Sequence, residues 1–209
     1  MDDQIIVPGE WQNVDVTKEP PKGFFNNFST HIIDFIQTLV VFGAIFALIY
    51  WQIAQPHRVS GNSMFPNFHN SDLIITDKLS YKFGDPQKGD IVVFENPRNN
   101  ADHFIKRVIA LPGDSIKVES EKVFVNGQLV EEVYLPDFVP TLPKGFLTEG
   151  VPIKAGDNQY YVFGDNREHS SDSREWGPIG KEKIIGKAFI RYWPIKGAGI
   201  LKTCCPINF

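Results

Sequence analysis

Two short segments of this sequence hold side chains capable of nucleophilic chemistry. In VSGNSMFPNF, residues 59–68, Ser63 is surrounded by glycine, asparagine and proline. These residues favour turns over a buried strand, so the Ser63 hydroxyl is expected on irregular, exposed backbone. A serine becomes a nucleophile when a neighbouring base accepts its proton. The simpler interpretation is an ordinary linker, because serine, asparagine and glycine are common in loops.

The second segment, HFIKRVIALPGD, places Lys106 and Arg107 within an otherwise apolar strand. Side chains alternate between the faces of a strand, so Lys106 shares one face with Phe104 and Val108, and Arg107 lies on the other. One interpretation is a lysine at a sheet edge, with its stem on apolar surface and its ammonium in water. The other is a buried lysine, whose lowered pKa would make it a base.

A third segment, GDNREHSSDSREWG, residues 164–177, gathers charged residues around serines. It could be a solvated loop with internal ion pairs. It lacks the glycine and terminal glutamate of a calcium loop, and no phosphate-binding or dinucleotide motif occurs, so neither a metal nor a cofactor is predicted. Nothing in the spacing favours a histidine over Lys106 as the base, although the sequence contains the members of a Ser-His-Asp triad. These are Ser63, His103 or His169, and Asp102 or Asp172.

Before these segments lies an apolar run of membrane-spanning length. Residues 39–51 read LVVFGAIFALIYW without a charge, and extension to residues 32–54 gives a span that could cross a bilayer as a helix. A buried core helix would usually have a polar face, which this run lacks. A cleaved signal peptide normally has a short leader, whereas about 30 residues precede this run. We therefore predict an uncleaved transmembrane helix.

The pattern after Pro56 changes to a period of two. Short segments rich in valine, isoleucine and aromatic residues alternate with clusters of glycine, proline, asparagine and aspartate, which is typical of antiparallel sheets. Residues 117–125 indicate a hairpin around Ser120 and Glu121, and Asn126-Gly127 suits a type I′ turn. The predicted fold is mainly β: an antiparallel sheet domain with a small β insertion, preceded by one transmembrane helix.

Composition limits the function classes. The chain has 209 residues with a net charge of −4 and no dense basic patch, which argues against nucleic-acid binding. Cys204 and Cys205 are adjacent and cannot staple a fold. In chain order, we predict an N-terminal tail at 1–31, a transmembrane helix at 32–54, a β domain at 55–203 with a small inserted subdomain at 113–159, and a C-terminal tail at 204–209.

The order SGNSMFP, FIKRVIALPGD and GDNREHSSDSR, following an apolar span, strongly resembles the bacterial type I signal peptidases. The resemblance covers roughly residues 32–194. It implies a mostly β fold with one or two membrane helices, and a Ser-Lys dyad that cleaves signal peptides from secreted precursors. By position, it implies Ser63 as the nucleophile, Lys106 as the general base and Ser170 as the residue that orients the lysine. It further implies that Asp172 and Arg174 hold the loop near the dyad as an ion pair.

One position departs from part of that family. Some members carry a hydroxyl two residues before the nucleophile, which donates to the oxyanion, whereas this chain has Gly61. The implied oxyanion donor is therefore the backbone N–H of Ser63.

The resemblance also implies partners and location. The partners are precursor proteins with small residues at the first and third positions before the cut, and the lipid bilayer. The implied location is the bacterial cytoplasmic membrane, crossed once, with the N-terminus in the cytoplasm and the catalytic domain outside. Two alternatives are a self-cleaving Ser-Lys peptidase of the repressor type, which the apolar run at 39–51 disfavours, and a non-catalytic membrane-anchored β scaffold.

Overall fold

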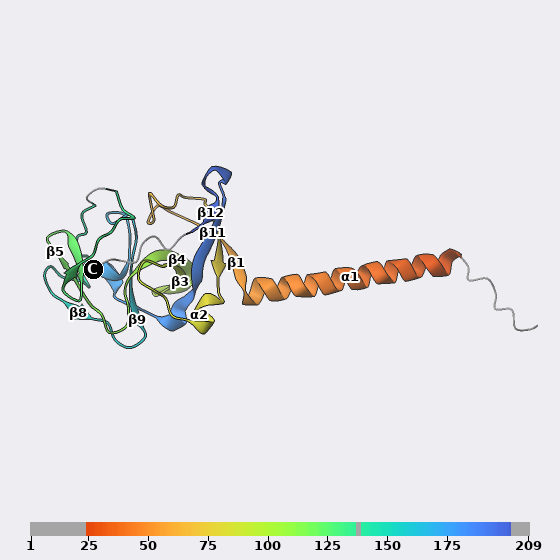
Figure 1. The fold of residues 1–209 in the computed structure, drawn as a ribbon, viewed down its shortest axis with the longest axis horizontal. Helices are drawn as coiled ribbons and strands as arrows, with labels where there is room; N and C mark the ends of the chain where they lie inside the picture. Colours follow the sequence, from red (N-terminus) through yellow and green to blue (C-terminus); the bar gives the residue numbers. More distant parts are fainter. Residues whose placement is uncertain (1–23, 137–138, 202–209) are drawn as a thin grey trace, which may run out of the picture. The chain divides into compact units, whose positions relative to one another are not determined.

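The computed structural model describes residues 24–136 and 139–201 (Figure 1). It divides into two compact units, Met1–Phe46 and Ala47–Phe209. Most of the predicted N-terminal tail at 1–31 lies outside the described residues. The predicted C-terminal tail at 204–209, with Cys204 and Cys205, lies outside them as well.

The apolar run forms a single long helix. Helix α1 covers Phe24–Gln52, and the segment Thr30–Tyr50 within it has the length and composition of a membrane span, with none of that segment buried. Its 21 residues correspond to about 30 Å of helix, close to the thickness of a bilayer core. The helix ends four residues before Pro56, whose ring disfavours helical backbone in the residue preceding it.

Among the described residues, the main sheet has eight antiparallel strands in the order β1-β2-β11-β3-β4-β9-β10, with β12 paired to β11 (Figure 1). Their bounds are β1 Ala54–Arg58, β2 Leu73–Asp77, β3 Ile91–Asn96, β4 Asn99–Ala110, β9 Gln159–Phe163, β10 Ile179–Gly180, β11 Ile184–Trp193 and β12 Gly199–Ile200. The fold prediction of a mainly antiparallel β protein is confirmed.

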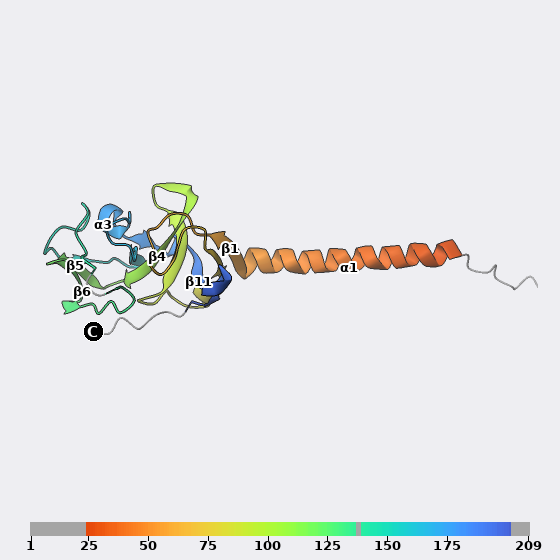
Figure 2. The same cartoon turned by 90° about the horizontal axis from the view of Figure 1, so that it is seen from above.

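A second, smaller sheet has the order β7-β6-β5-β8. Its strands are β5 Ser115–Glu119, β6 Lys122–Val125, β7 Gln128–Leu129 and β8 Ile153–Lys154. Positive φ angles at Ser120 (49°) and Glu121 (63°) turn the first hairpin, and those at Asn126 (54°) and Gly127 (81°) turn the second. Both predicted turns are confirmed, because I′ turns need left-handed backbone at both central positions. Figure 2 shows this sheet on the far side of β4 from β1.

Short helices complete the fold: α2 Ser80–Phe83, α3 Ser173–Trp176, and the 3-10 turns η1 Lys181–Lys183 and η2 Ile195–Gly197. Three apolar clusters form the core. One of them buries Val59, Met64 and Phe68 against side chains of β2, β3, β4 and β11. These three anchors flank Ser63, so an otherwise irregular segment has a fixed position on the sheet.

Candidate active site

Ser63 lies in a turn that packing and hydrogen bonds hold in place. Met64 and Phe68 are each 1% exposed, and the Phe68 N–H donates to the Met64 carbonyl at 2.9 Å. The Ser63 carbonyl accepts a hydrogen bond of 3.0 Å from the Asn166 N–H, and the Asn166 side-chain amide donates to the Asn62 carbonyl at 3.0 Å. The turn thus fixes the backbone of Ser63 while its side chain stays only partly buried. No motif in the sequence predicted a role for Asn166, although it lies in the charged third segment.

Lys106 lies beside this serine. Its Nζ is 2.7 Å from Ser63 Oγ and 3.0 Å from the Ile105 carbonyl oxygen, and it lies 5.2 Å from the centre of the Phe104 ring. The residue is 3% exposed. The interpretation of Lys106 as a solvent-exposed edge lysine is therefore wrong. Packing of the Ser63 turn over β4 covers the side chain.

Burial changes the protonation of this lysine. Desolvation lowers the pKa of Lys106 from its ordinary 10.5 to about 8, although the carboxylates of Asp172 and Asp165 act in the opposite direction. About a tenth of such groups would be neutral at pH 7, against fewer than one in a thousand for an ordinary lysine. Lys106 can therefore accept a proton from Ser63 near neutral pH.

Arg107 points to the opposite face of β4, as strand alternation predicts. Its guanidinium makes two hydrogen bonds to Asp165, of 2.9 and 2.7 Å, and a third of 3.0 Å to the Gly89 carbonyl. The ring of Tyr134 lies 3.9 Å from the guanidinium carbon. This buried, bidentate pair ties β4, next to Lys106, to the first residues of the charged loop.

Asp172 and Arg174 form a second buried pair within the loop. Their side chains are fully buried and 2.8 Å apart. Burial alone would raise the pKa of Asp172, but the Arg174 guanidinium, the Gly164 N–H and the Ser170 hydroxyl together outweigh it and hold that pKa below its usual range. Asp172 also accepts hydrogen bonds from the Gly164 N–H at 3.0 Å and from the Arg174 N–H at the start of α3. The charged loop is therefore a mostly buried element, exposed only at Glu168, His169 and Ser171. The interpretation of a loop with internal ion pairs is confirmed, but its solvation is limited to those three residues.

Ser170 of the same loop packs against Gly164, close to the Ser63 backbone. Its Oγ is buried and has no hydrogen-bond partner of normal geometry among the described residues, although the hydroxyl lies close enough to the Asp172 carboxylate to help lower the pKa of that group. Specifically, no hydrogen bond joins it to Lys106 in the described part of the chain. A Cβ placed on Gly164 would clash with both Ser170 Oγ and the Ser63 carbonyl, so both serines pack closely against this glycine.

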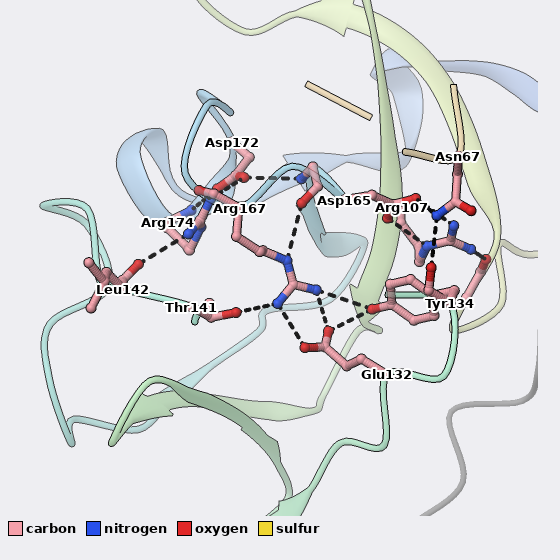
Figure 3. A network of polar contacts seen from close by, with 12 residues as sticks. Asn67, Arg107, Glu132, Tyr134, Thr141, Leu142, Asp165, Arg167, Asp172 and Arg174 are labelled. Atoms are coloured by element: carbon pink, nitrogen blue, oxygen red, sulfur yellow. Dashed lines mark hydrogen bonds and ion pairs between the residues drawn. The ribbon is translucent and has the colours of Figure 1, made fainter. Parts of the chain in front are cut away.

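A polar network joins the loop to residues that the sequence did not single out (Figure 3). Arg167 is 1% exposed, and its guanidinium donates hydrogen bonds to both carboxylate oxygens of Glu132. It also donates to the Thr141 hydroxyl and, at 3.2 Å, to the Tyr134 hydroxyl. Burial disfavours the charge of Arg167, but Glu132, with smaller contributions from Tyr134 and Asp165, more than offsets this and raises its pKa. Glu132 and Tyr134 belong to a Pro- and Gly-rich excursion whose local sequence carries no sign of this contact.

The groove beside Ser63 and Lys106 has a volume of about 310 Å³. Ser63 and Lys106 line it together with His57, His103 and His169. Within the described residues, no histidine makes a hydrogen bond to Ser63 Oγ, and the ring of His103 contacts His57 instead. The geometry therefore places a lysine, and not a histidine, in contact with the serine. The same residues contain no cluster of three or more His, Cys, Asp and Glu side chains suited to a metal.

Comparison with known proteins identifies the family. The family model described as "Signal peptidase, peptidase S26" matches residues 32–193. This chain belongs to the signal peptidase family. It is 41% identical over 155 residues to a probable signal peptidase I-2 of Synechocystis, covering 71% of this chain and 67% of that protein. It is also 32% identical over 174 residues to signal peptidase IB of Staphylococcus aureus, covering 78% and 90%.

Among solved structures, the chain is similar to a signal peptidase I from Enterococcus faecalis, at 26% identity and a TM-score of 0.42, covering 50% of this chain and 97% of that one. Membership of the signal peptidase family makes the chain a hydrolase, a serine endopeptidase. The relatives support removal of signal peptides from secreted precursors as its reaction. The repressor-type and scaffold alternatives are therefore set aside.

Proposed function

We propose that this chain is a membrane-bound endopeptidase that removes signal peptides after small residues, with Ser63 as nucleophile and Lys106 as general base. The observation that carries the proposal is the 2.7 Å contact between Lys106 Nζ and Ser63 Oγ, made by a lysine that is 3% exposed. A base must lie within hydrogen-bond reach of the proton that it accepts, and it must be neutral in part at the working pH. Lys106 meets both conditions.

The reaction follows from these atoms. Neutral Lys106 accepts the Ser63 proton as Oγ attacks the scissile carbonyl, and the Ser63 backbone N–H donates to the oxyanion that forms. Within the described residues that N–H has no other acceptor. The Lys106 ammonium then protonates the departing amine. A water molecule, deprotonated by the same lysine, hydrolyses the acyl-enzyme and frees Ser63.

We assign supporting roles to the charged loop. The buried Ser170 hydroxyl is available to bond to Lys106 and orient it once the site is engaged. Asp172 and Arg174 keep that hydroxyl close to the serine and lysine by fixing the loop through their buried ion pair. In this proposal, Ser170 is an uncharged group that orients Lys106, and the Asp172–Arg174 pair keeps the loop rigid.

The main sheet offers an edge at which a precursor segment can bind. Strand β4 pairs with β3 along residues 103–107, whereas β9 pairs with β4 only from Arg107 onward. The other edge of β4 just before Lys106 is therefore unpaired among the described strands. An extended precursor segment can add there as a strand, with main-chain hydrogen bonds for affinity and alternate side chains read by the groove. Small residues at the first and third positions before the cut fit this arrangement.

The same proposal includes the membrane and the domain limits. Residues 32–54 cross the cytoplasmic membrane once, residues 1–31 lie in the cytoplasm, and the β domain at 55–203, with its inserted subdomain at 113–159, lies outside. The apolar segment Thr30–Tyr50 supports a span. Protease added to spheroplasts should cut the β domain and spare an epitope on the tail. Protection of the β domain would reverse the orientation.

The deciding experiment measures cleavage of a secretory precursor by the detergent-solubilised full chain. Ser63→Ala and Lys106→Arg should each abolish cleavage, because the arginine keeps the charge but cannot act as a base. Lys122→Arg, at an exposed position on β6, is the matched control and should keep wild-type activity. The wild-type rate should rise with pH through an apparent pKa near 8. An active Lys106→Arg variant, or a rising limb near pH 6.5, would contradict the Ser-Lys assignment.

A further inference from the structure

The proposed reaction depends on three segments that come from distant parts of the chain. Ser63 lies in the turn 59–68, which we call the nucleophile turn, Lys106 lies in β4, and Ser170 lies in the charged loop 164–177. The 2.7 Å contact between Lys106 Nζ and Ser63 Oγ joins side chains of two of these segments. A displacement of about 1 Å at such a contact can cost about a hundredfold in rate. The fold must therefore fix the three segments relative to one another.

Tyr134 contacts all three segments (Figure 3). Its main-chain carbonyl accepts a hydrogen bond of 2.9 Å from the side-chain amide of Asn67, in the nucleophile turn. Its ring lies 3.9 Å from the guanidinium carbon of Arg107, the residue after the general base in β4. Its hydroxyl accepts a hydrogen bond of 3.2 Å from Arg167, in the charged loop. A single residue of the inserted region therefore joins the parts of the chain that carry the reacting groups.

Asn67 also ties the nucleophile turn directly to the charged loop. Its side-chain nitrogen, which carries two hydrogens, donates to the Tyr134 carbonyl and, at 2.8 Å, to Asp165 Oδ2. The same carboxylate accepts two hydrogen bonds from the Arg107 guanidinium. Asn67 lies four residues after the nucleophile, and Arg107 lies directly after the general base. The network is thus attached to the chain close to both reacting side chains.

The smaller sheet holds Tyr134 in place. Tyr134 is 8% exposed and belongs to the apolar cluster that contains Ile116 of β5 and Val125 of β6. Four residues earlier, the Val130 N–H donates to the carbonyl of Val123 in β6 at 2.9 Å. The smaller sheet therefore fixes the position of Tyr134, and Tyr134 in turn restrains the segments that it contacts.

We propose that Tyr134 is a positioning residue for the proposed reaction: it holds the nucleophile turn against β4 and the charged loop, so that Ser63 stays within reach of Lys106. Within the described residues, neither Tyr134 nor its polar partners line the groove, so this role is separate from substrate contact. It also gives the smaller sheet a function, which is to support the catalytic geometry. The inference rests on the proposed function, since it assigns Tyr134 a role in that reaction.

Loss of this support should affect the chemical step more than substrate binding. If the nucleophile turn moves away from β4, Ser63 Oγ and Lys106 Nζ separate and kcat falls, whereas KM, which depends on the groove, changes little. The same movement exposes Lys106 to water. Its pKa, which burial lowers from 10.5 to about 8, should then rise again. A smaller folded fraction would also reduce kcat, but it would not move the pH at which the rate rises.

The substitutions in the test neither add nor remove a charged group that faces Lys106. Those groups are the carboxylates of Asp165 and Asp172, together with Arg58, His57, His103 and His169 of the groove lining. A shift of the rising limb in the pH–rate profile therefore reports a change in the burial of Lys106.

The test compares Tyr134→Leu with Tyr161→Leu in the detergent-solubilised full chain, with a secretory precursor as substrate. Tyr161 of β9 is 1% exposed and lies in the same apolar cluster, so both variants lose packing in one core. Tyr134→Leu should lower kcat about 10–100-fold with KM nearly unchanged. It should also move the rising limb upward by about one pH unit. Tyr161→Leu should keep the wild-type kcat per folded molecule and the wild-type rising limb.

Two further variants complete the set. Tyr134→Phe keeps the ring beside Arg107 and should recover most of the activity that Tyr134→Leu loses. Asn67→Leu replaces the amide by an apolar side chain of similar size at a partly buried position, and it decides the question if Tyr134→Leu does not fold. It removes both hydrogen bonds of the Asn67 amide, so it should lower kcat and raise the rising limb in the same direction.

The outcomes distinguish the inference from the proposed function. Wild-type kcat and an unshifted rising limb in Tyr134→Leu, or in Asn67→Leu, overturn the inference while the wild-type chain still cleaves the precursor. Equal effects of Tyr134→Leu and Tyr161→Leu overturn it as well, because Tyr134 would then act only through packing. If the wild-type chain does not cleave the precursor, or if Ser63→Ala does, the proposed function fails and the inference fails with it.

Discussion

Replacement of Lys106 by methionine should make the folded protein more stable while it destroys activity. Methionine keeps an unbranched side chain of similar length but carries no charge. In the wild type, burial lowers the pKa of Lys106 from 10.5 to about 8. At roughly 1.4 kcal/mol for each pKa unit, the folded state is destabilised by about 3 kcal/mol when this lysine is protonated. Loss of the contact with Ser63 returns about 1 kcal/mol, so the net gain at pH 7 should be about 2 kcal/mol.

The sign of the pH dependence follows from proton binding. Between pH 8 and pH 10.5 the unfolded chain holds a proton on Lys106 that the folded chain has released. Stability therefore rises with pH across this window in the wild type. Below pH 8 both states are protonated and the destabilisation is complete. The advantage of Lys106→Met should accordingly be largest at pH 7 and should shrink as the pH approaches 10.5.

Denaturant unfolding in detergent at pH 7 and pH 10 measures this effect, with cleavage assayed on the same samples. Lys122→Met, on the exposed face of β6, is the matched control and should change stability little at either pH. For a unit of this size, 2 kcal/mol corresponds to roughly 4–8 °C in Tm. A Lys106→Met variant that is less stable than wild type at pH 7 would refute the claim that burial destabilises the protonated lysine. A difference in unfolding free energy between the two proteins that does not change with pH would refute it as well.

Three further predictions concern the supports of the site. Gly61→Ala should cost about 1 kcal/mol of stability and reduce activity only modestly, because its φ of +86° strains an added Cβ that meets no atom within 4 Å; a hundredfold loss of kcat with unchanged backbone would contradict this. Gly164→Ala should abolish cleavage of a precursor, since the added Cβ clashes with the Ser63 carbonyl. A Gly164→Ala variant that cleaves at the wild-type rate would refute this close contact. Glu132→Gln should destabilise the fold by about 3–5 kcal/mol in denaturant titrations, because it leaves the Arg167 charge buried and without its carboxylate partner. Glu132→Asp should cost less stability, and a loss under 1 kcal/mol in Glu132→Gln would count against the network.

Much of the architecture could be predicted because local sequence decides it. A period of two specifies a strand with one buried face, as in β5, where buried residues alternate with partly exposed ones. Left-handed turn positions such as Asn126-Gly127 follow from the side chains themselves. The long uncharged run specified α1 for the same reason. The candidate residues Ser63 and Lys106 came from motif order and resemblance, which name residues without giving their distance.

By itself, then, the sequence determined the strand periods, the hairpin turns, the apolar helix and the chemical groups on offer. Only the tertiary structure decided the protonation of Lys106, because its burial depends on a turn 43 residues away packing over β4. Only the tertiary structure paired Glu132 with Arg167 and brought His57 against His103. Such contacts join segments whose local patterns are independent of each other. Desolvation and charge pairing are properties of the assembled neighbourhood, and no single segment contains them.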